Sequence, residues 1–174
     1  MIGSMIGSNR IRRAAATLAA VGMLWMGSTH FLRAQTAYYP EEASCSTASV
    51  AGAWAYTETG MVIPATGAVS FNAVARYTLD AEGNMSGTAT SSSGGAVSSV
   101  TLKGSGTVKS DCTGTLTVGV YTTAGTLLRT VTFAFVYVDN AREGRAIVTS
   151  LVLANGTAVP AGLTINSKKL FPGR

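Results

Sequence analysis

The side chains of this sequence that could do chemistry are carboxylates, tyrosines, lysines and hydroxyls. The only histidine is His30, and it lies in a stretch that we expect to be removed on export. The rest of the chain then has no imidazole, which excludes Ser-His-Asp and Cys-His catalysis and the common catalytic zinc sites. We therefore predict no catalytic residue of these kinds, no metal site and no cofactor.

Glu58 is the one acidic residue whose place in the pattern could point it inward. Trp54, Tyr56 and Glu58 alternate with other residues and so share one face of an extended strand, predicted over residues 50–58. A carboxyl group buried on that face would have a raised pKa and could act as an acid or a base. The pattern favours the simpler alternative, in which Glu58 ends the strand in water.

Cys112 lies at the tip of a predicted hairpin, between two runs of alternating threonine and apolar residues over residues 104–118. Exported proteins usually pair their cysteines. We expect Cys45 and Cys112 to form a disulfide, because Cys45 is the only other cysteine. It would close a loop of roughly 67 residues and add about 4 kcal/mol of stability. Two free thiols are the alternative.

The first 34 residues have the layout of a secretory signal peptide. Arginines 10, 12 and 13 precede an apolar run over residues 14–27 that is short for a membrane span. Cleavage is expected near Ala34, which makes the mature protein secreted or periplasmic, with no stable membrane span. A retained membrane anchor is the alternative.

Export would also change the charge of the protein. The chain has 13 basic and 8 acidic residues, and removing the leader takes four arginines and no acid, which leaves a net charge of about +1. Binding to nucleic acid needs clustered lysine and arginine to neutralise phosphates. The remaining basic residues are scattered, apart from Lys168 and Lys169, so we exclude nucleic acid as a partner.

From Val50 onward the sequence alternates with period two and lacks the apolar spacing of a helix. Turn signals divide it into eight candidate strands joined by short loops. They cover residues 50–58, 68–79, 85–90, 97–108, 114–122, 127–139, 145–153 and 157–170. Short connections between eight consecutive strands predict an all-β, antiparallel up-and-down barrel. A two-sheet β-sandwich is the alternative.

We divide the chain accordingly into four parts. Residues 1–34 are the signal peptide, residues 35–48 an N-terminal extension, residues 49–170 the barrel and residues 171–174 a tail.

The strand predicted over residues 127–139 is apolar on both faces. One face carries Val131, Phe133, Phe135 and Tyr137, and the other carries Ala134, Val136 and Val138. Because only one face of a barrel strand can face the core, we expect the second face to be covered by the N-terminal extension, by a neighbouring sheet or by another subunit. The last case would make the protein a homo-oligomer.

Several short motifs carry a resemblance to known proteins. Gly52-Ala53-Trp54, at the start of the first strand, resembles the signature of the lipocalins and wider calycins. A larger pattern resembles a group of short exported bacterial proteins of unassigned function. In these proteins the following recur in order: Cys45, Gly52-Ala53-Trp54, residues 76–84, Ser86-Gly87-Thr88, Gly106-Thr107-Val108 and Asp111-Cys112-Thr113-Gly114-Thr115.

This resemblance covers residues 45–150 and implies a calycin or allene-oxide-cyclase-type barrel far more than an activity. In the lipocalins the tryptophan plugs one end of the barrel, and the open end often holds a small apolar ligand. The chain departs from them in having no C-terminal helix and no clear arginine partner for Trp54.

Two main functions follow as expectations. The first is a non-enzymatic exported barrel that binds a small apolar molecule in its lumen, or serves as an envelope or extracellular module. The second is a cofactor-free isomerase or cyclase that resembles allene oxide cyclases and uses Glu58 and Tyr56. A self-associating structural protein is a third. The candidate lumen residues are Trp54, Tyr56, Glu58, Phe71, Tyr77, Phe133 and Phe135.

Overall fold

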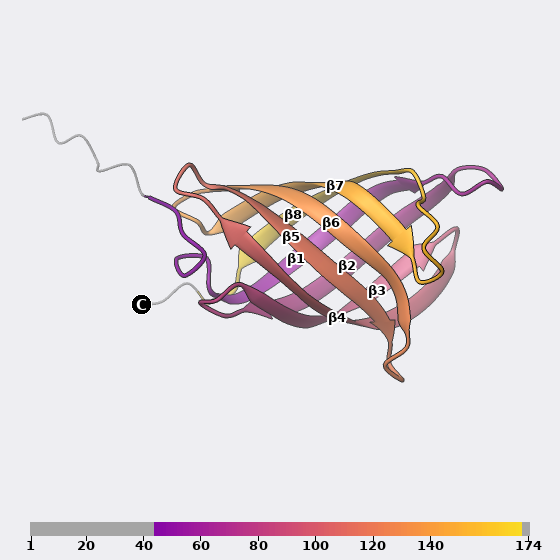
Figure 1. Cartoon of the computed structure of the whole chain (residues 1–174), viewed down its shortest axis with the longest axis horizontal. Helices are drawn as coiled ribbons and strands as arrows, with labels where there is room; N and C mark the ends of the chain where they lie inside the picture. The colour runs from indigo at the N-terminus through magenta and orange to yellow at the C-terminus, as the bar shows by residue number, and fades with distance from the viewer. Residues whose placement is uncertain (1–43, 172–174) are drawn as a thin grey trace, which may run out of the picture. The chain divides into compact units, whose positions relative to one another are not determined.

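A computed structural model describes residues 44–171, which form a closed antiparallel barrel of eight strands in chain order (Figure 1). The predicted barrel is thus confirmed, and the β-sandwich is wrong. The predicted signal peptide and most of the N-terminal extension lie outside the described residues. The strands are β1 Gly52–Val62, β2 Val69–Leu79, β3 Asn84–Ser93, β4 Ala96–Val108, β5 Thr113–Thr122, β6 Leu127–Val138, β7 Glu143–Leu153 and β8 Ala161–Lys169.

Alternation along each strand decides which side chains enter the barrel. In β2, Phe71, Ala73 and Tyr77 are buried, whereas Asn72 and Val74 between them are exposed.

The turns between strands use side chains that bind their own backbone. In the β2–β3 turn, Asp80 Oδ1 accepts hydrogen bonds from the backbone N–H groups of Glu82 and Asn84, at 3.1 and 2.7 Å.

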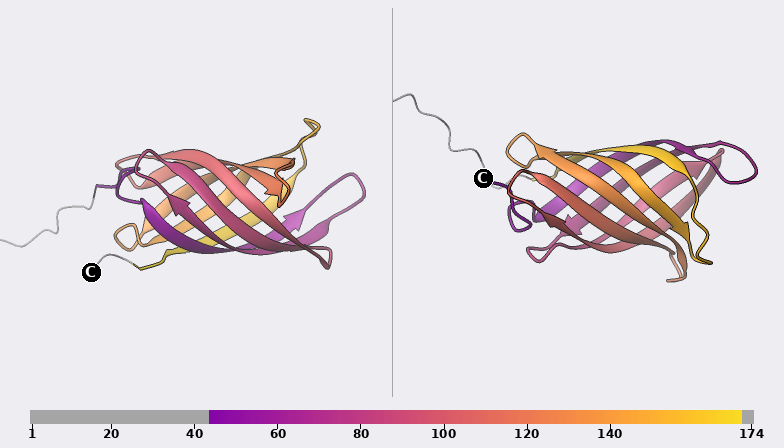
Figure 2. Two further views of the ribbon diagram at one scale, coloured as in Figure 1. Left: turned by 90° about the horizontal axis from the view of Figure 1, so that it is seen from below. Right: turned by 45° about the horizontal axis from the view of Figure 1, so that its top comes forward.

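The two ends of the barrel differ in what closes them. The hairpins β1–β2, β3–β4, β5–β6 and β7–β8 surround one end, which we call the mouth (Figure 2). The start of β1, the end of β8 and the other three hairpins lie at the opposite end, which we call the floor.

Trp54 closes the floor from inside. Its side chain is fully buried, stacks on Tyr77 with ring centroids 6.3 Å apart, and meets the edge of Tyr137 at 5.8 Å. The indole N–H donates a hydrogen bond to the Val50 carbonyl at 2.9 Å. The largest side chain of the barrel is therefore held by aromatic packing and one buried hydrogen bond.

Lys169 is the cation beside Trp54, for which the sequence shows no clear arginine partner. Its Nζ lies 5.9 Å from the centre of the indole ring and donates a hydrogen bond to the Ser49 carbonyl at 3.1 Å. The lysine stem crosses Gly52, where a Cβ atom would lie 2.9 Å from the lysine Cε. Gly52 also has a φ of 133°, so the glycine of the Gly-x-Trp motif is required both by its backbone and by this close approach.

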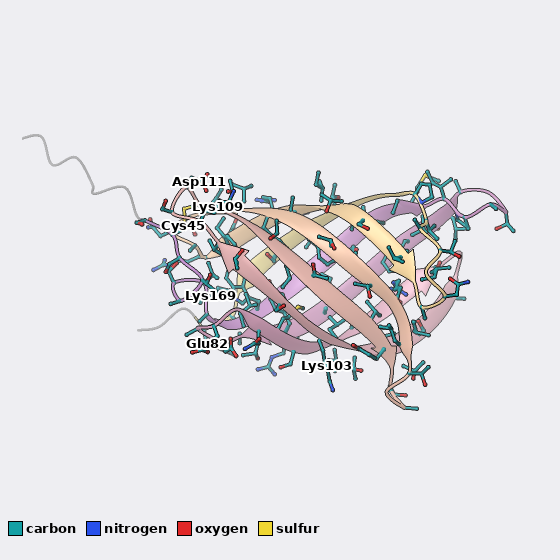
Figure 3. The ribbon with its side chains drawn as sticks, viewed as in Figure 1. Cys45, Glu82, Lys103, Lys109, Asp111 and Lys169 are labelled. Carbon is teal, nitrogen blue, oxygen red and sulfur yellow. A yellow bond between two sulfur atoms is a disulfide. The ribbon has the colours of Figure 1, made fainter. Side chains whose placement is uncertain are left out.

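A Cys45–Cys112 disulfide joins the segment before β1 to the β4–β5 turn, with the Cα atoms 4.9 Å apart. Cys45 lies at the floor end beside Lys109 and Asp111 (Figure 3). The same segment is tied to the barrel by a hydrogen bond from the Val108 N–H to Thr47 Oγ1 at 3.1 Å. A disulfide of this kind indicates a location outside the cytoplasm. None of residues 44–171 belongs to a helix that could span a bilayer.

The outer face of β6 is not covered by a neighbouring sheet or by the described part of the N-terminal extension. Val136 and Val138 each expose 41% of their surface and Ala134 is half-buried, so the second face of the strand is not buried among the described residues. The segment before β1 packs at the floor instead, as the contact between Thr47 and Val108 shows. Valine on this face satisfies the β-propensity of the strand and needs no partner. Association through β6 remains a prediction.

The disulfide should carry a large share of the stability. Replacing both cysteines, Cys45→Ser with Cys112→Ser, should lower the free energy of unfolding by about 4 kcal/mol, because the bridge closes a long loop in the unfolded chain. Urea unfolding monitored by circular dichroism measures the loss. Reductant should destabilise the unsubstituted protein by a similar amount and leave the double variant unchanged. A midpoint that reductant does not move would contradict the prediction.

Candidate functional site

The barrel encloses a cavity of about 200 Å³ that opens at the mouth. It extends from Tyr77 and Phe135 above the floor to Val62 and Leu153 at the mouth. An apolar cavity of about 150 Å³ is large enough to hold benzene. The lumen therefore has room for a small molecule.

Small side chains on one wall explain why the lumen is not filled. Eight strands give a barrel just narrow enough for side chains to fill its interior. Here β2 and β3 contribute Ala73, Ala89 and Ser91, while β6 on the far side contributes Phe133 and Phe135. The alanines and the serine have short side chains and fill little of the space in front of these rings.

Six of the seven predicted lumen residues line this cavity. They are Tyr56, Glu58, Phe71, Tyr77, Phe133 and Phe135. Trp54 does not line it, which corrects the prediction, because its ring is packed beneath Tyr77 and against Tyr137 as part of the floor.

Glu58 is buried inside the barrel, with only 6% of its surface exposed. The favoured expectation of a strand-end glutamate in water is wrong, because β1 continues to Val62. Its strand neighbours are Ala73 of β2 and Ile165 of β8, and no described residue donates a hydrogen bond to its carboxyl group. Removal from water raises the pKa of Glu58 to about 7, against a smaller opposing effect of Arg129.

Arg129 is the lumen residue that the sequence analysis missed. It lies on β6 and its guanidinium carbon is 5.4 Å from the centre of the Phe71 ring on β2. In a closed ring of eight strands β2 and β6 are opposite each other, so the side chain crosses the lumen. Burial lowers the pKa of Arg129, and the nearby Glu58 acts in the other direction. The sequence did indicate this position, because Arg129 lies two and four residues before the inward-facing Val131 and Phe133 and therefore shares their face of the strand.

Neutral polar groups also line the cavity. Tyr56 packs against Tyr77 with ring centres 5.8 Å apart, and burial together with the neighbouring Glu58 raises the pKa of its phenol well above the usual value. The hydroxyls of Ser91 and Ser98 lie 3.2 Å apart. Tyr56 thus stays a neutral hydrogen-bonding group throughout the physiological range.

The remaining wall of the cavity is mostly apolar. It consists of aliphatic, methionine and aromatic side chains from β3, β4, β5, β6 and β8. These include Met85, Val100, Leu102, Leu116, Val118, Val131, Phe133 and Ile165. No cluster of three or more histidine, cysteine, aspartate or glutamate side chains that could hold a metal ion occurs among residues 44–171. The arrangement can hold an apolar body beside a small polar group.

Comparison with known proteins adds no assignment to this geometry. No protein-family model matches the chain, and a search of curated proteins finds no match either.

The burial of Glu58 should make folding stability depend on pH. Its pKa is about 7 in the folded protein and 4.5 as a free side chain, so between these values the folded state binds more protons than the unfolded state. The contribution of Glu58 to the free energy of unfolding should therefore be greatest below about pH 4.5. It should decrease as the pH rises towards 7, by about 3 kcal/mol in total.

Urea unfolding at a series of pH values measures this effect. Glu58→Gln should remove the fall, because the amide does not titrate, whereas Glu82→Gln in the exposed β2–β3 turn should keep it. An identical pH profile for the protein and the Glu58 variant would show that the carboxyl group is not buried.

Proposed function

We propose that this protein is a non-enzymatic barrel that binds a small, mostly apolar molecule in its lumen. The observation that carries the proposal is the open cavity of about 200 Å³ lined by apolar and aromatic side chains. Ligand sites in proteins are typically concave and apolar, with a few polar groups that orient the ligand. Glu58, Arg129 and Tyr56 would be those groups here.

The place of action that fits this proposal is outside the cytoplasm. The disulfide supports it, and the layout of residues 1–34 predicts secretion or release into the periplasm with cleavage near Ala34. The calycin resemblance of the Gly52-Ala53-Trp54 motif is consistent with a binding barrel. As a likeness at the level of fold, it supports the architecture more than the ligand.

Filling the lumen should abolish binding. Ala89 is buried on the β3 wall of the cavity, so Ala89→Phe would place a ring where the ligand lies. We expect the affinity for N-phenylnaphthylamine, a neutral apolar probe that fluoresces when bound, to fall by about tenfold or more.

Val74→Phe is the matched control, because Val74 lies on the outer face of β2 and exposes 58% of its surface. It should leave probe binding unchanged. Absence of any probe binding by the unsubstituted protein, together with no bound small molecule in its native mass spectrum, would overturn the proposal.

A second candidate is a cofactor-free isomerase or cyclase of the allene-oxide-cyclase type. The observation that favours it is the burial of Glu58 in the cavity beside Tyr56, with a pKa of about 7. A carboxyl group with this pKa can donate or accept a proton near neutral pH. Such a reaction requires little more than a shaped pocket and one or two polar groups.

This candidate predicts a product in which one enantiomer is in excess. An unsaturated allene oxide cyclises without a catalyst to a racemic cyclopentenone, so an enantiomeric excess in the presence of the protein would report catalysis. Glu58→Gln should remove the excess if the carboxyl group is the proton donor, whereas Glu82→Gln should not. Chiral chromatography measures it, and a racemic product with the unsubstituted protein would exclude this activity.

A further inference from the structure

Arg129 is a cation inside the barrel that has no ionic partner there. The carboxylate that forms ion pairs in the described part of the chain is Glu143, on the outer surface, and its partners are Arg145 and Lys168. No described residue accepts a hydrogen bond from the Arg129 guanidinium. A partly desolvated guanidinium without a counter-charge is costly, and a bound anion would remove that cost.

The nitrogen atoms of Arg129 remain accessible from the lumen. Among the described residues, no fully buried side-chain nitrogen or oxygen lacks a hydrogen-bond partner, so the unbonded guanidinium nitrogens are not sealed in the wall. The side chain also lines the cavity directly. A ligand in the lumen can therefore reach guanidinium N–H donors.

The groups closest to Arg129 do not neutralise it. Glu58 makes no ion pair with Arg129, and burial favours its uncharged form. Tyr56 is an uncharged phenol, and Phe71 contributes only the face of its ring. The lumen thus keeps a positive charge when Glu58 is protonated.

No other charge surrounds the mouth. The four segments that form the mouth hairpins and adjoining strand ends contain no aspartate, glutamate, lysine or arginine. They are residues 59–72, 90–101, 119–128 and 149–164. An entering molecule therefore meets Arg129 as the one cation among the described residues at this end, and the charge preference of the site depends on it.

We propose that the lumen ligand is an apolar monocarboxylic acid, a proposal that rests on the ligand-binding function proposed above. Its carboxylate pairs with Arg129, and its hydrocarbon part fills the apolar part of the cavity. A planar guanidinium can hold one carboxylate through two parallel hydrogen bonds. Glu58 in its acid form and the Tyr56 hydroxyl are further hydrogen-bond donors in the lumen, and both interact electrostatically with Arg129. One cation matches a single negative charge, which favours a carboxylate over a phosphate dianion.

Titration calorimetry with three ligands of equal chain length tests this proposal without any substitution. Octanoate should bind the unsubstituted protein about tenfold or more tightly than octanol, because a charge-assisted pair replaces a neutral hydrogen bond. Octylamine should bind less tightly than octanol, because its charge repels Arg129. Equal binding of octanoate and octanol would overturn the proposed ligand class and leave the apolar binding function intact. If none of the three binds, both proposals fail.

The Arg129→Met variant then tests whether Arg129 causes the preference for octanoate over octanol. Methionine keeps an unbranched apolar stem but has no charge, so octanoate should lose its advantage over octanol. Arg76→Met, on the outer face of β2, is the matched control and should keep the preference. An octanoate preference that survives Arg129→Met would place the carboxylate elsewhere and overturn the assignment.

Discussion

Closure of the sheet by β1 and β8 is the constraint on which the rest of the structure depends. Antiparallel pairing from Trp54–Lys169 to Val62–Ala161 leaves the sheet without an edge. The seam is close, since a Cβ atom on Gly60 would collide with the Gly162 carbonyl. Once the ring is closed, every second residue must point inward. Glu58 and Arg129 enter the lumen for this reason.

The floor contributes to the stability of the barrel, whereas the mouth gives access to the cavity. The floor holds the disulfide, the Trp54 packing and the Lys169 contact with the indole ring. With one end fixed in this way, the other end can keep small side chains such as Ala73 and Ala89 and leave a cavity open. The mouth hairpins contain no charged side chain. The charge preference for an entering ligand therefore depends on the charged groups inside the lumen.

Most of the fold was predictable from the sequence, because alternation and turn residues are local signals. The predicted first strand ended too early, since Thr59 and Gly60 hide its continuation to Val62. That error placed Glu58 in water. Arg129 was missed because a charged side chain is normally taken to face solvent, although its parity with Val131 indicated the lumen. Whether the outer face of β6 is covered depends on the closed ring and on neighbours, and no local pattern contains that information.

The separation of Glu58 and Arg129 on different walls gives the lumen its chemistry. They lie on β1 and β6, with β7 and β8 between these strands around the ring, and they form no ion pair. A direct pair would cancel both charges and make the cavity indifferent to the charge of its ligand. Kept apart, the carboxyl group lowers its desolvation cost by taking up a proton, whereas the guanidinium retains its charge at physiological pH. The same apolar surroundings thus raise the pKa of the carboxyl group to about 7 and leave the guanidinium without an ion-pair partner in one lumen.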